Sequence, residues 1–343
     1  MAAVGASPVD GAAPRAASSR CGALIAVAAF AFAPVAWGQD AAAWLARAAS
    51  AARQLNYAGT IVYQQSGRVE TARIVHVNEG GQEFEKLVNL DGPPREVIRG
   101  NGEVRCYYPD ARVVRIEPLT FRNAFPSLSP QQQKALAEHY DFRVLEGERV
   151  AGQQAQVVVF EPKDGQRYGH KFWADAATGL LLKARLVDER RETIGQFAFI
   201  ELAIGGRIDR ELVKPSWPPV PPDWQVRSFA PGDAEQADTG WQVGRLPAGF
   251  TKTVEGFRTL RGKRHKVAHL MYTDGLVAVS VFVETVGSAP HPTGLQQVHG
   301  MNAYSRQLDD QLVVVLGEVP PATLRQIALS VGRRPPRPPA ATP

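Results

Sequence analysis

The sequence predicts an α+β fold that consists mostly of antiparallel β-strands and is divided into two domains. Three observations support this prediction. The chain has 343 residues, which exceeds the length of a typical single domain. Short runs rich in Val, Ile and Tyr alternate with Gly-containing turns over most of the sequence, which is the pattern of consecutive β-hairpins. A proline-rich stretch, residues 214–240, interrupts these runs and indicates a linker between the domains.

The N-terminus carries the features of a secretory signal peptide. Arg15 and Arg20 precede an apolar run, and Ala36-Trp37-Gly38 supplies the small residues of a cleavage site. The apolar run, residues 21–33, is shorter than the roughly 20 residues that a membrane-spanning helix needs. We therefore expect residues 1–38 to be removed during export, which leaves a soluble protein outside the cytoplasm.

The mature chain is expected to carry a small positive charge and one cysteine. The formal net charge of the full chain is +5, which is too low for a nucleic-acid-binding face and favours acidic protein partners or anionic lipid head groups. Cys21 lies within the expected signal peptide, so no internal disulfide is expected. Cys106 alternates with Val104 and Tyr108 in a predicted strand, and we expect it to pack as a small hydrophobic residue rather than act as a nucleophile.

The first predicted domain, residues 39–213, begins with a helix and continues as a meander. Residues 40–55 are rich in alanine, and their larger apolar residues have near-helical spacing. Strand patterns separated by turns follow from Tyr57 to Pro118 and from Asp141 to Ile204. A meander of this length must curl into a barrel or half-barrel to limit its exposed edges.

One face of the first strand is expected to line an apolar cavity. Tyr57, Ile61 and Tyr63 alternate with more polar residues and therefore share a face. Residues 119–140 interrupt the strands with further apolar side chains and a helix-like stretch, which predicts a lid. We expect the following residues to line or cover the cavity: Tyr57, Ile61, Tyr63, Phe121, Phe125 and Leu128.

The second predicted domain, residues 241–332, is a smaller α+β unit. Its sequence predicts strands over residues 241–286, a helix near residues 295–307, a strand at residues 313–316 and a closing helix that begins at Pro320. Residues 333–343 combine arginines with prolines, which predicts a disordered tail.

A basic cluster stands out in the second domain. It is either a solvated hairpin or a docking site for an acidic peptide or a lipid phosphate. The cluster consists of Arg258, Arg261, Lys263, Arg264 and Lys266.

The residue patterns that carry enzymatic chemistry do not accumulate in this sequence. The segment from Gly256 to Gly262-Lys263 has the wrong glycine spacing for a phosphate-binding loop. His265 and His269 share a predicted strand face about 13 Å apart, which is too far to hold one metal ion. We therefore predict no catalytic residue, no metal site and no cofactor.

Several segments, taken in order and spacing, resemble the RseB/MucB family, whose members regulate envelope-stress sigma factors of the sigma-E (AlgU) type. The resemblance covers residues 41–331, which is nearly the whole mature chain. The segments that carry it are Leu55-Asn56-Tyr57 with Gly59, residues 91–97 (DGPPREV), residues 139–142 (HYDF), residues 164–168 (DGQRY) with Trp173, and residues 272–276 (YTDGL) with Ser280-Val281.

The resemblance implies a fold, a place and a function. It implies that the first domain is similar to the lipoprotein carriers LolA and LolB, a curved half-barrel with lid helices, and that the protein is periplasmic. It further implies that the protein binds the periplasmic domain of a transmembrane anti-sigma factor (RseA/MucA-like) and shields it from site-one proteolysis. Lipid, lipopolysaccharide or the acyl chains of mislocalised lipoproteins are implied as the signal that releases this complex. The family has no catalytic motif to carry over.

Other functions remain open from the residues alone. The same half-barrel fits a periplasmic carrier of lipids or lipoproteins, although a carrier needs only the first domain. An esterase is a third candidate. The sequence leaves open which lipid is sensed, which regulon is controlled and whether the chain forms a homodimer.

Overall fold

The computed structural model describes residues 37–65, 67–118, 136–228, 234–260, 265–287, 291–298 and 301–335. These residues belong to one compact unit that begins at Ala36. The first helix, α1 (Trp37–Gln54), confirms the helix expected at residues 40–55. Most of the expected signal peptide, and the apolar part of the expected lid, lie outside the described residues. In the described ranges, no helix is long and apolar enough to cross a membrane.

Among the described residues, twelve strands form the first sheet, in the order β12-β6-β5-β4-β3-β2-β1-β11-β10-β9-β8-β7. Neighbouring strands pair antiparallel, except that β12 pairs parallel with β6. The bounds are β1 Tyr57–Gln65, β2 Arg68–Glu79, β3 Gln82–Asn89, β4 Glu96–Gly100, β5 Glu103–Tyr108, β6 Val113–Pro118, β7 Tyr140–Val150, β8 Gln153–Pro162, β9 Gly169–Asp175, β10 Leu181–Val187, β11 Thr193–Ile204 and β12 Gln225–Ser228.

Local turn chemistry sets the register of these hairpins. At the turn between β4 and β5, Asn101 and Gly102 have φ angles of 53° and 77°. Asn and Gly tolerate this left-handed region and therefore favour a tight hairpin turn whose twist matches the flanking strands. The alternating pattern of β5 places Cys106 and Val104 in one apolar cluster with Val97, which confirms the packing role predicted for this cysteine.

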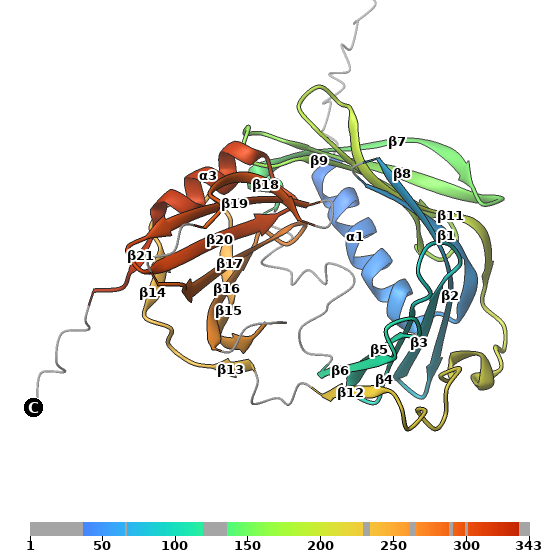
Figure 1. Cartoon of the computed structure of the whole chain (residues 1–343). Coiled ribbons are helices and arrows are strands. Elements are labelled where there is room, and N and C mark those ends of the chain that lie inside the picture. Colours follow the sequence, from blue (N-terminus) through green and yellow to red (C-terminus); the bar gives the residue numbers. More distant parts are fainter. Residues whose placement is uncertain are drawn as a thin grey trace, which may run out of the picture. The chain divides into compact units, whose positions relative to one another are not determined.

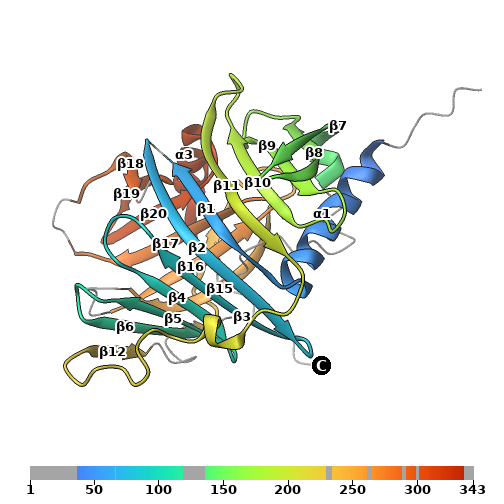
Figure 2. The same ribbon diagram turned by 90° about the vertical axis from the view of Figure 1, so that its right-hand side faces the viewer.

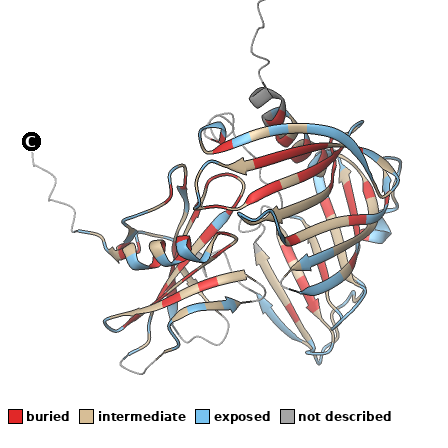
Figure 3. Cartoon of the chain, turned by 90° about the horizontal axis from the view of Figure 1, so that it is seen from above, coloured by how far each residue is buried: buried red, intermediate tan, exposed pale blue. Residues whose placement is uncertain are grey.

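The first sheet curves around α1 (Figures 1 and 2). On its apolar face the helix presents Ala41 and Leu45, which pack with Phe160 of β8 and Phe172 of β9. Buried positions run along these strands, as Figure 3 shows by colour. The fold class is therefore as predicted: mostly antiparallel β-structure in an open sheet around a helix.

The proline-rich stretch packs against the first sheet. It follows a short 3-10 helix, η2 (Arg210–Val213). The Ser216 backbone N–H donates a hydrogen bond of 2.9 Å to the buried Glu96 of β4. The Trp217 ring stacks on Tyr107 of β5 at 5.8 Å and lies 5.4 Å from the Trp224 ring. This part of the expected linker is thus held on the sheet by polar and aromatic contacts.

Within the described part of the chain, seven strands form a second sheet in the order β13-β15-β16-β17-β20-β19-β18. Its core contains Leu270, Val281 and Val315, and Leu324 and Ile327 of the last helix pack on this face. The bounds are β13 Ala234–Gln236, β15 Thr251–Thr259, β16 Lys266–Thr273, β17 Ala278–Thr285, β18 Gly294–Val298, β19 Met301–Leu308, β20 Gln311–Gly317 and α3 Pro321–Ser330.

The prediction of a helix near residues 295–307 is wrong, because strands β18 and β19 occupy this range. Leu295, Val298 and Met301 have a spacing of three that imitates a helix. Strand pairing decides otherwise, since β18 pairs with β19 and β19 pairs with β20 from Asn302 to Leu308.

The chain continues as a strand beyond α3. β21 (Val331–Arg333) pairs antiparallel with β14 (Trp241–Val243). Arg334 donates a hydrogen bond of 2.8 Å to Glu255 of β15. Regular structure therefore reaches into the range expected to be a tail, and residues 336–343 lie outside the described residues.

Candidate functional site

The three residues predicted to line the cavity from β1 share one face but have different environments. Tyr57 is buried, with 6% of its surface exposed. Its ring stacks on His76 at 4.8 Å and meets the edge of Phe199 at 6.3 Å. Ile61 is partly buried against the same apolar cluster. These two side chains thus form part of the packed interior of the first sheet.

Tyr63 lies at the other end of β1, where 41% of its surface is exposed. Its hydroxyl donates to Gln65 Oε1 at 2.7 Å, and Gln65 Nε2 donates in turn to Glu318 Oε1 at 3.0 Å. Partial burial, with the charge of Glu318, raises the pKa of Tyr63 to about 12. The pKa of Glu318 is itself raised by burial. Tyr63 therefore takes part in a polar contact between β1 and the residue that follows β20.

Phe121, Phe125 and Leu128, the other residues predicted for the cavity, lie outside the described residues. The structure gives no position for this part of the predicted lid.

Two residues of the predicted basic cluster are described, and they lie on neighbouring strands. Arg258 of β15 is half-buried and pairs in register with Val267 of β16, next to the exposed Lys266. Burial, with the charge of Arg258, lowers the pKa of His269 to about 4. Arg261, Lys263 and Arg264 lie outside the described residues. Arg258 and Lys266 therefore lie close along neighbouring strands, but alternation along β16 places Lys266 on the sheet face opposite to that of Arg258.

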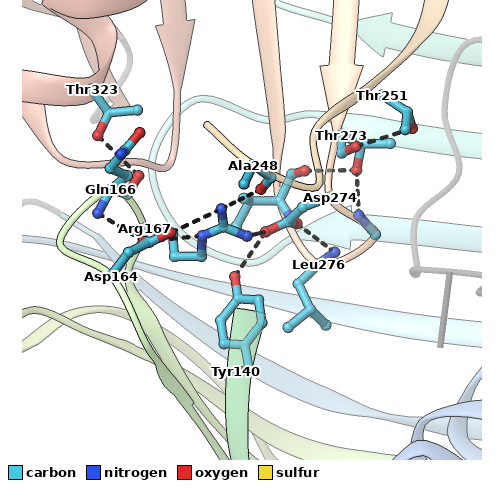
Figure 4. A network of polar contacts seen from close by, with 12 residues as sticks. Tyr140, Asp164, Gln166, Arg167, Ala248, Thr251, Thr273, Asp274, Leu276 and Thr323 are labelled. Carbon is cyan, nitrogen blue, oxygen red and sulfur yellow. Dashed lines mark hydrogen bonds and ion pairs between the residues drawn. The ribbon is translucent and has the colours of Figure 1, made fainter. Parts of the chain in front are cut away.

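A buried polar network links the first sheet to the second (Figure 4). Arg167, in the turn between β8 and β9, donates from Nη1 to Asp274 Oδ2 at 3.0 Å and from Nη2 to Ala248 O at 2.6 Å. The Tyr140 hydroxyl at the start of β7 donates to the same Asp274 oxygen at 2.9 Å. The Arg167 guanidinium also lies over the rings of Tyr140 and Phe250, at 5.5 and 5.3 Å.

The turn that contains Asp274 fixes the orientation of its carboxylate. Its other oxygen, Oδ1, accepts hydrogen bonds of 3.0 Å from the backbone N–H groups of Leu276 and Val277. These bonds fix the turn between β16 and β17 and orient the carboxylate toward Arg167. A buried charge needs such partners, because its desolvation is costly.

His170 lies beside this network and is buried, with 6% of its surface exposed. Its ring is 6.3 Å from that of Tyr140 and 5.6 Å from that of Phe172, and among the described residues its Nε2 atom has no hydrogen-bond partner. Burial lowers the pKa of His170 to about 4, against a smaller opposing effect of Asp274. The imidazole is therefore neutral at neutral pH.

The residue patterns of the sequence do not single out this network as a site. One signal was present, because Tyr140, Arg167 and Asp274 each belong to a segment through which the chain resembles the RseB/MucB family. These three segments are distant in sequence and meet in the structure (Figure 4).

Two arrangements bear on metal binding and catalysis. Among the described residues, no group of three His, Cys, Asp or Glu side chains is placed to hold a metal ion. Ser280 Oγ lies 3.2 Å from His269 Nε2, but that ring is stacked on Phe282 at 4.4 Å and only 6% of His269 is exposed. This Ser–His contact is packed into the sheet rather than open to a substrate.

Comparison with known proteins identifies the family. The MucB/RseB N-terminal domain matches residues 40–217, and the MucB/RseB C-terminal domain matches residues 235–332. The chain belongs to the MucB/RseB family. The resemblance read from the sequence is thereby confirmed.

Relatives of this MucB/RseB protein are named as regulators of sigma factors. The chain is 34% identical over 305 residues to the sigma factor AlgU regulatory protein MucB of Pseudomonas aeruginosa, which covers 87% of this chain and 92% of the relative. It is 28% identical over 291 residues to the sigma-E factor regulatory protein RseB of Escherichia coli, which covers 82% and 87%.

Solved structures of MucB include complexes with MucA. One, of MucB with MucA(peri), has a TM-score of 0.67 at 33% identity and covers 86% of this chain and 100% of that chain. Another, of MucA/MucB from Pseudomonas aeruginosa, has a TM-score of 0.68 at 32% identity and covers 86% and 99%.

Proposed function

We propose that this MucB/RseB protein is a negative regulator of envelope-stress sigma factor signalling. In this proposal it is exported to the periplasm, binds the periplasmic domain of a transmembrane anti-sigma factor and shields that domain from site-one proteolysis. The observation that carries the proposal is the match of both family domains together with the likeness to MucB in complexes with MucA.

We also propose that lipid, lipopolysaccharide or lipoprotein acyl chains release the partner. By linkage, a ligand that favours the partner-free state lowers partner affinity by the same factor that the partner lowers ligand affinity. An acyl chain gains about 0.8 kcal/mol per buried methylene, so a few carbons supply enough free energy to shift the equilibrium. Apolar side chains on the α1 side of the first sheet, such as Ile61, support a ligand site there.

We propose that lipid sensing and partner binding belong to different domains. Residues 39–213 would sense the lipid, and residues 241–332 would contact the partner through Arg258, Lys266 and the rest of the basic cluster. The buried network of Tyr140, Arg167 and Asp274 supports communication between them, because it joins the first sheet directly to the second.

A binding experiment tests the proposal. The mature protein is titrated with the purified periplasmic segment of the cognate anti-sigma factor, with and without a lipopolysaccharide fragment, and the segment is then exposed to the site-one protease. We expect tight binding that lipid weakens, and slower cleavage of the bound segment. Absence of partner binding together with stoichiometric acyl-chain uptake would instead identify a lipid carrier.

A further inference from the structure

One turn of the first domain contacts the second domain through three consecutive residues. Gln166 O, in the turn between β8 and β9, accepts a hydrogen bond of 2.9 Å from Thr323 Oγ1 of α3. The Tyr168 hydroxyl accepts one of 3.3 Å from Asn302 Nδ2 of β19. Arg167, between them in sequence, donates to the turn between β16 and β17 (Figure 4). This turn therefore holds the two sheets together at one place.

His170 follows this turn on β9 and is buried at the same interface. Its ring lies beside those of Tyr140 and Phe172. Leu276 of the second domain packs against the apolar cluster to which both of these rings belong, so the second domain helps to exclude water from His170. Among the described residues, the Nε2 atom of His170 has no hydrogen-bond partner, and burial of this imidazole therefore costs free energy.

The charges near His170 belong to the network that joins the two sheets. The Asp274 carboxylate acts on His170 and already accepts from Arg167 Nη1 and from the Tyr140 hydroxyl. Burial keeps the pKa of Tyr140 above its usual range, so this hydroxyl remains a neutral donor. A second carboxylate, Asp164, lies 3.2 Å from Arg167 Nη2 and is 30% exposed. One cation, Arg167, thus faces one fully buried carboxylate.

The elements on either side of β9 place apolar side chains against His170. Phe160 of β8 and Leu186 of β10 pair in register with it, and α1 contributes alanine and leucine side chains to the same cluster. Glu161 and Arg185, next to these two residues in sequence, point to the opposite face of the sheet because side chains alternate along a strand. The charges that act on His170 therefore come from the interface network.

A proton on His170 would unbalance these charges. The closed interface would then hold two buried cations, on His170 and Arg167, against the one fully buried carboxylate of Asp274. An uncompensated buried charge is costly. Separation of the turns at the interface would admit water to His170 and leave the hydrogen bonds within each sheet in place. Opening of the interface is thus a smaller rearrangement than the unfolding of either sheet.

The size of the effect follows from the affinity of the imidazole for protons in the closed and open forms. Burial lowers the pKa of His170 from its ordinary value of 6.5 to about 4. Between these pH values the closed form binds fewer protons than the open form, so acidification favours opening. From pH 7 to pH 4.5 the equilibrium constant for opening should rise roughly 50-fold.

We propose that protonation of His170 opens the contact between the two sheets and makes it an acid-sensitive switch. A second contact should persist in acid, because Gln65 Nε2 donates to Glu318 Oε1 at 3.0 Å and a protonated carboxyl still offers an oxygen to this donor. The inference goes beyond the proposed function and does not depend on it, because opening is measured on the protein alone.

Hydrogen exchange of the mature protein at pH 7 and pH 4.5, corrected for the intrinsic exchange rates, tests the proposal. The backbone amides of Leu276 and Val277, which donate to Asp274, report on the interface. The amides of Val157 and Val281, two fully buried core residues, report on the two sheets. We expect the interface amides to be less protected than the core amides at both pH values. Their protection should fall at least about 50-fold on acidification.

Two neutral replacements test the role of the histidine. His170→Phe and His170→Gln cannot take up a proton, so acidification should lower their interface protection about 50-fold less than that of the wild type. His139→Gln is the matched control. His139 lies at the same interface, where a Cβ atom on Gly249 would be 2.4 Å from its Nε2, but it is partly exposed and can take up a proton without opening. This control should keep the wild-type response.

Tyr140→Phe tests the interface while it keeps the histidine. The variant removes only the hydroxyl that donates to Asp274, so the interface amides should be about tenfold less protected at pH 7 and should keep their response to acid. The proposal is overturned if interface and core amides are equally protected at pH 4.5, or if the folded His170 variants keep the full response to acid. It is also overturned if His139→Gln abolishes this response or if Tyr140→Phe leaves the interface protection unchanged.

Discussion

Arg167 Nη1 lies 3.0 Å from Asp274 Oδ2, and the two side chains are only 0% and 1% exposed. The first comes from the turn between β8 and β9 and the second from the turn between β16 and β17. This ion pair is therefore a fully desolvated contact between the two sheets. A second carboxylate, Asp164, lies 3.2 Å from Nη2 of the same guanidinium and is 30% exposed.

Asp274→Asn should lower the free energy of unfolding by about 3 to 5 kcal/mol, because it leaves the buried Arg167 charge without its buried counter-ion. The ion pair between Asp164 and the Arg167 guanidinium remains in this variant, so we expect a loss at the lower end of that range. Urea unfolding followed by fluorescence and by circular dichroism measures the change.

The matched control is an exposed ion pair of the first sheet. Arg191 lies 3.5 Å from Glu161 and its side chain is 80% exposed. Arg191→Gln should cost less than about 1 kcal/mol. An equal loss in both variants would show that desolvation does not distinguish the two pairs.

Gly59→Ala tests the close packing of β1 against β11. A Cβ atom at this position would lie 2.3 Å from Glu201 O and 3.0 Å from Phe199 Cδ1, so backbone must shift. We expect a loss of about 1 to 3 kcal/mol in the free energy of unfolding. Gly165→Ala is the control, since a Cβ atom there has nothing within 4 Å. A neutral effect of Gly59→Ala would mean that the two strands separate easily.

Stability should fall as the pH falls from about 6.5 to about 4. Burial lowers the pKa of His170 to about 4, so the unfolded state binds more protons than the folded state in this window. Between pH 7 and pH 4.5 the His170 contribution is about 2 to 3 kcal/mol of unfolding free energy. His269, whose pKa is also lowered to about 4 by burial and by Arg258, adds to the same trend.

His170→Phe isolates this contribution from carboxylates that titrate in the same range. Urea unfolding of the variant at pH 7 and pH 4.5 should show a smaller loss on acidification than the wild type shows. His265→Gln, at an exposed position, is the control for the replacement of a histidine outside the core. Identical pH profiles for His170→Phe and the wild type would refute the assignment.

Local sequence patterns predicted much of this fold, but they did not predict the contacts between residues that are distant in sequence. The strand that begins at Tyr57 and the Gly-containing turns between strands are local features, and both predictions hold, the turns for example at Asn101 and Gly102. Two contacts depend on how distant parts of the chain meet, which no local pattern encodes. They are the pairing of β1 with β11 and the hydrogen bond between Arg167 and Asp274, which are 107 residues apart. The helix predicted from Leu295 onward failed because the pairing of β18 with β19, and of β19 with β20, outweighs the local helical spacing.

The candidate site was predicted less completely than the fold. Aromatic residues on one face of β1 predicted a shared surface, but the burial of Tyr57 and the exposure of Tyr63 depend on neighbours such as His76 and Gln65.

Charge reversal at the described part of the basic cluster tests its proposed role in partner binding. Arg258→Glu with Lys266→Glu should weaken binding of the anti-sigma segment by about tenfold or more, mainly through slower association, and should reduce the salt dependence of the rate. The reason is that rim charges steer an acidic partner before contact, while their removal leaves apolar contacts in place. Surface plasmon resonance at two salt concentrations measures both effects. Arg68→Glu with Arg73→Glu makes the same charge change on β2, so an equal loss in that control would attribute the effect to net charge rather than to the cluster.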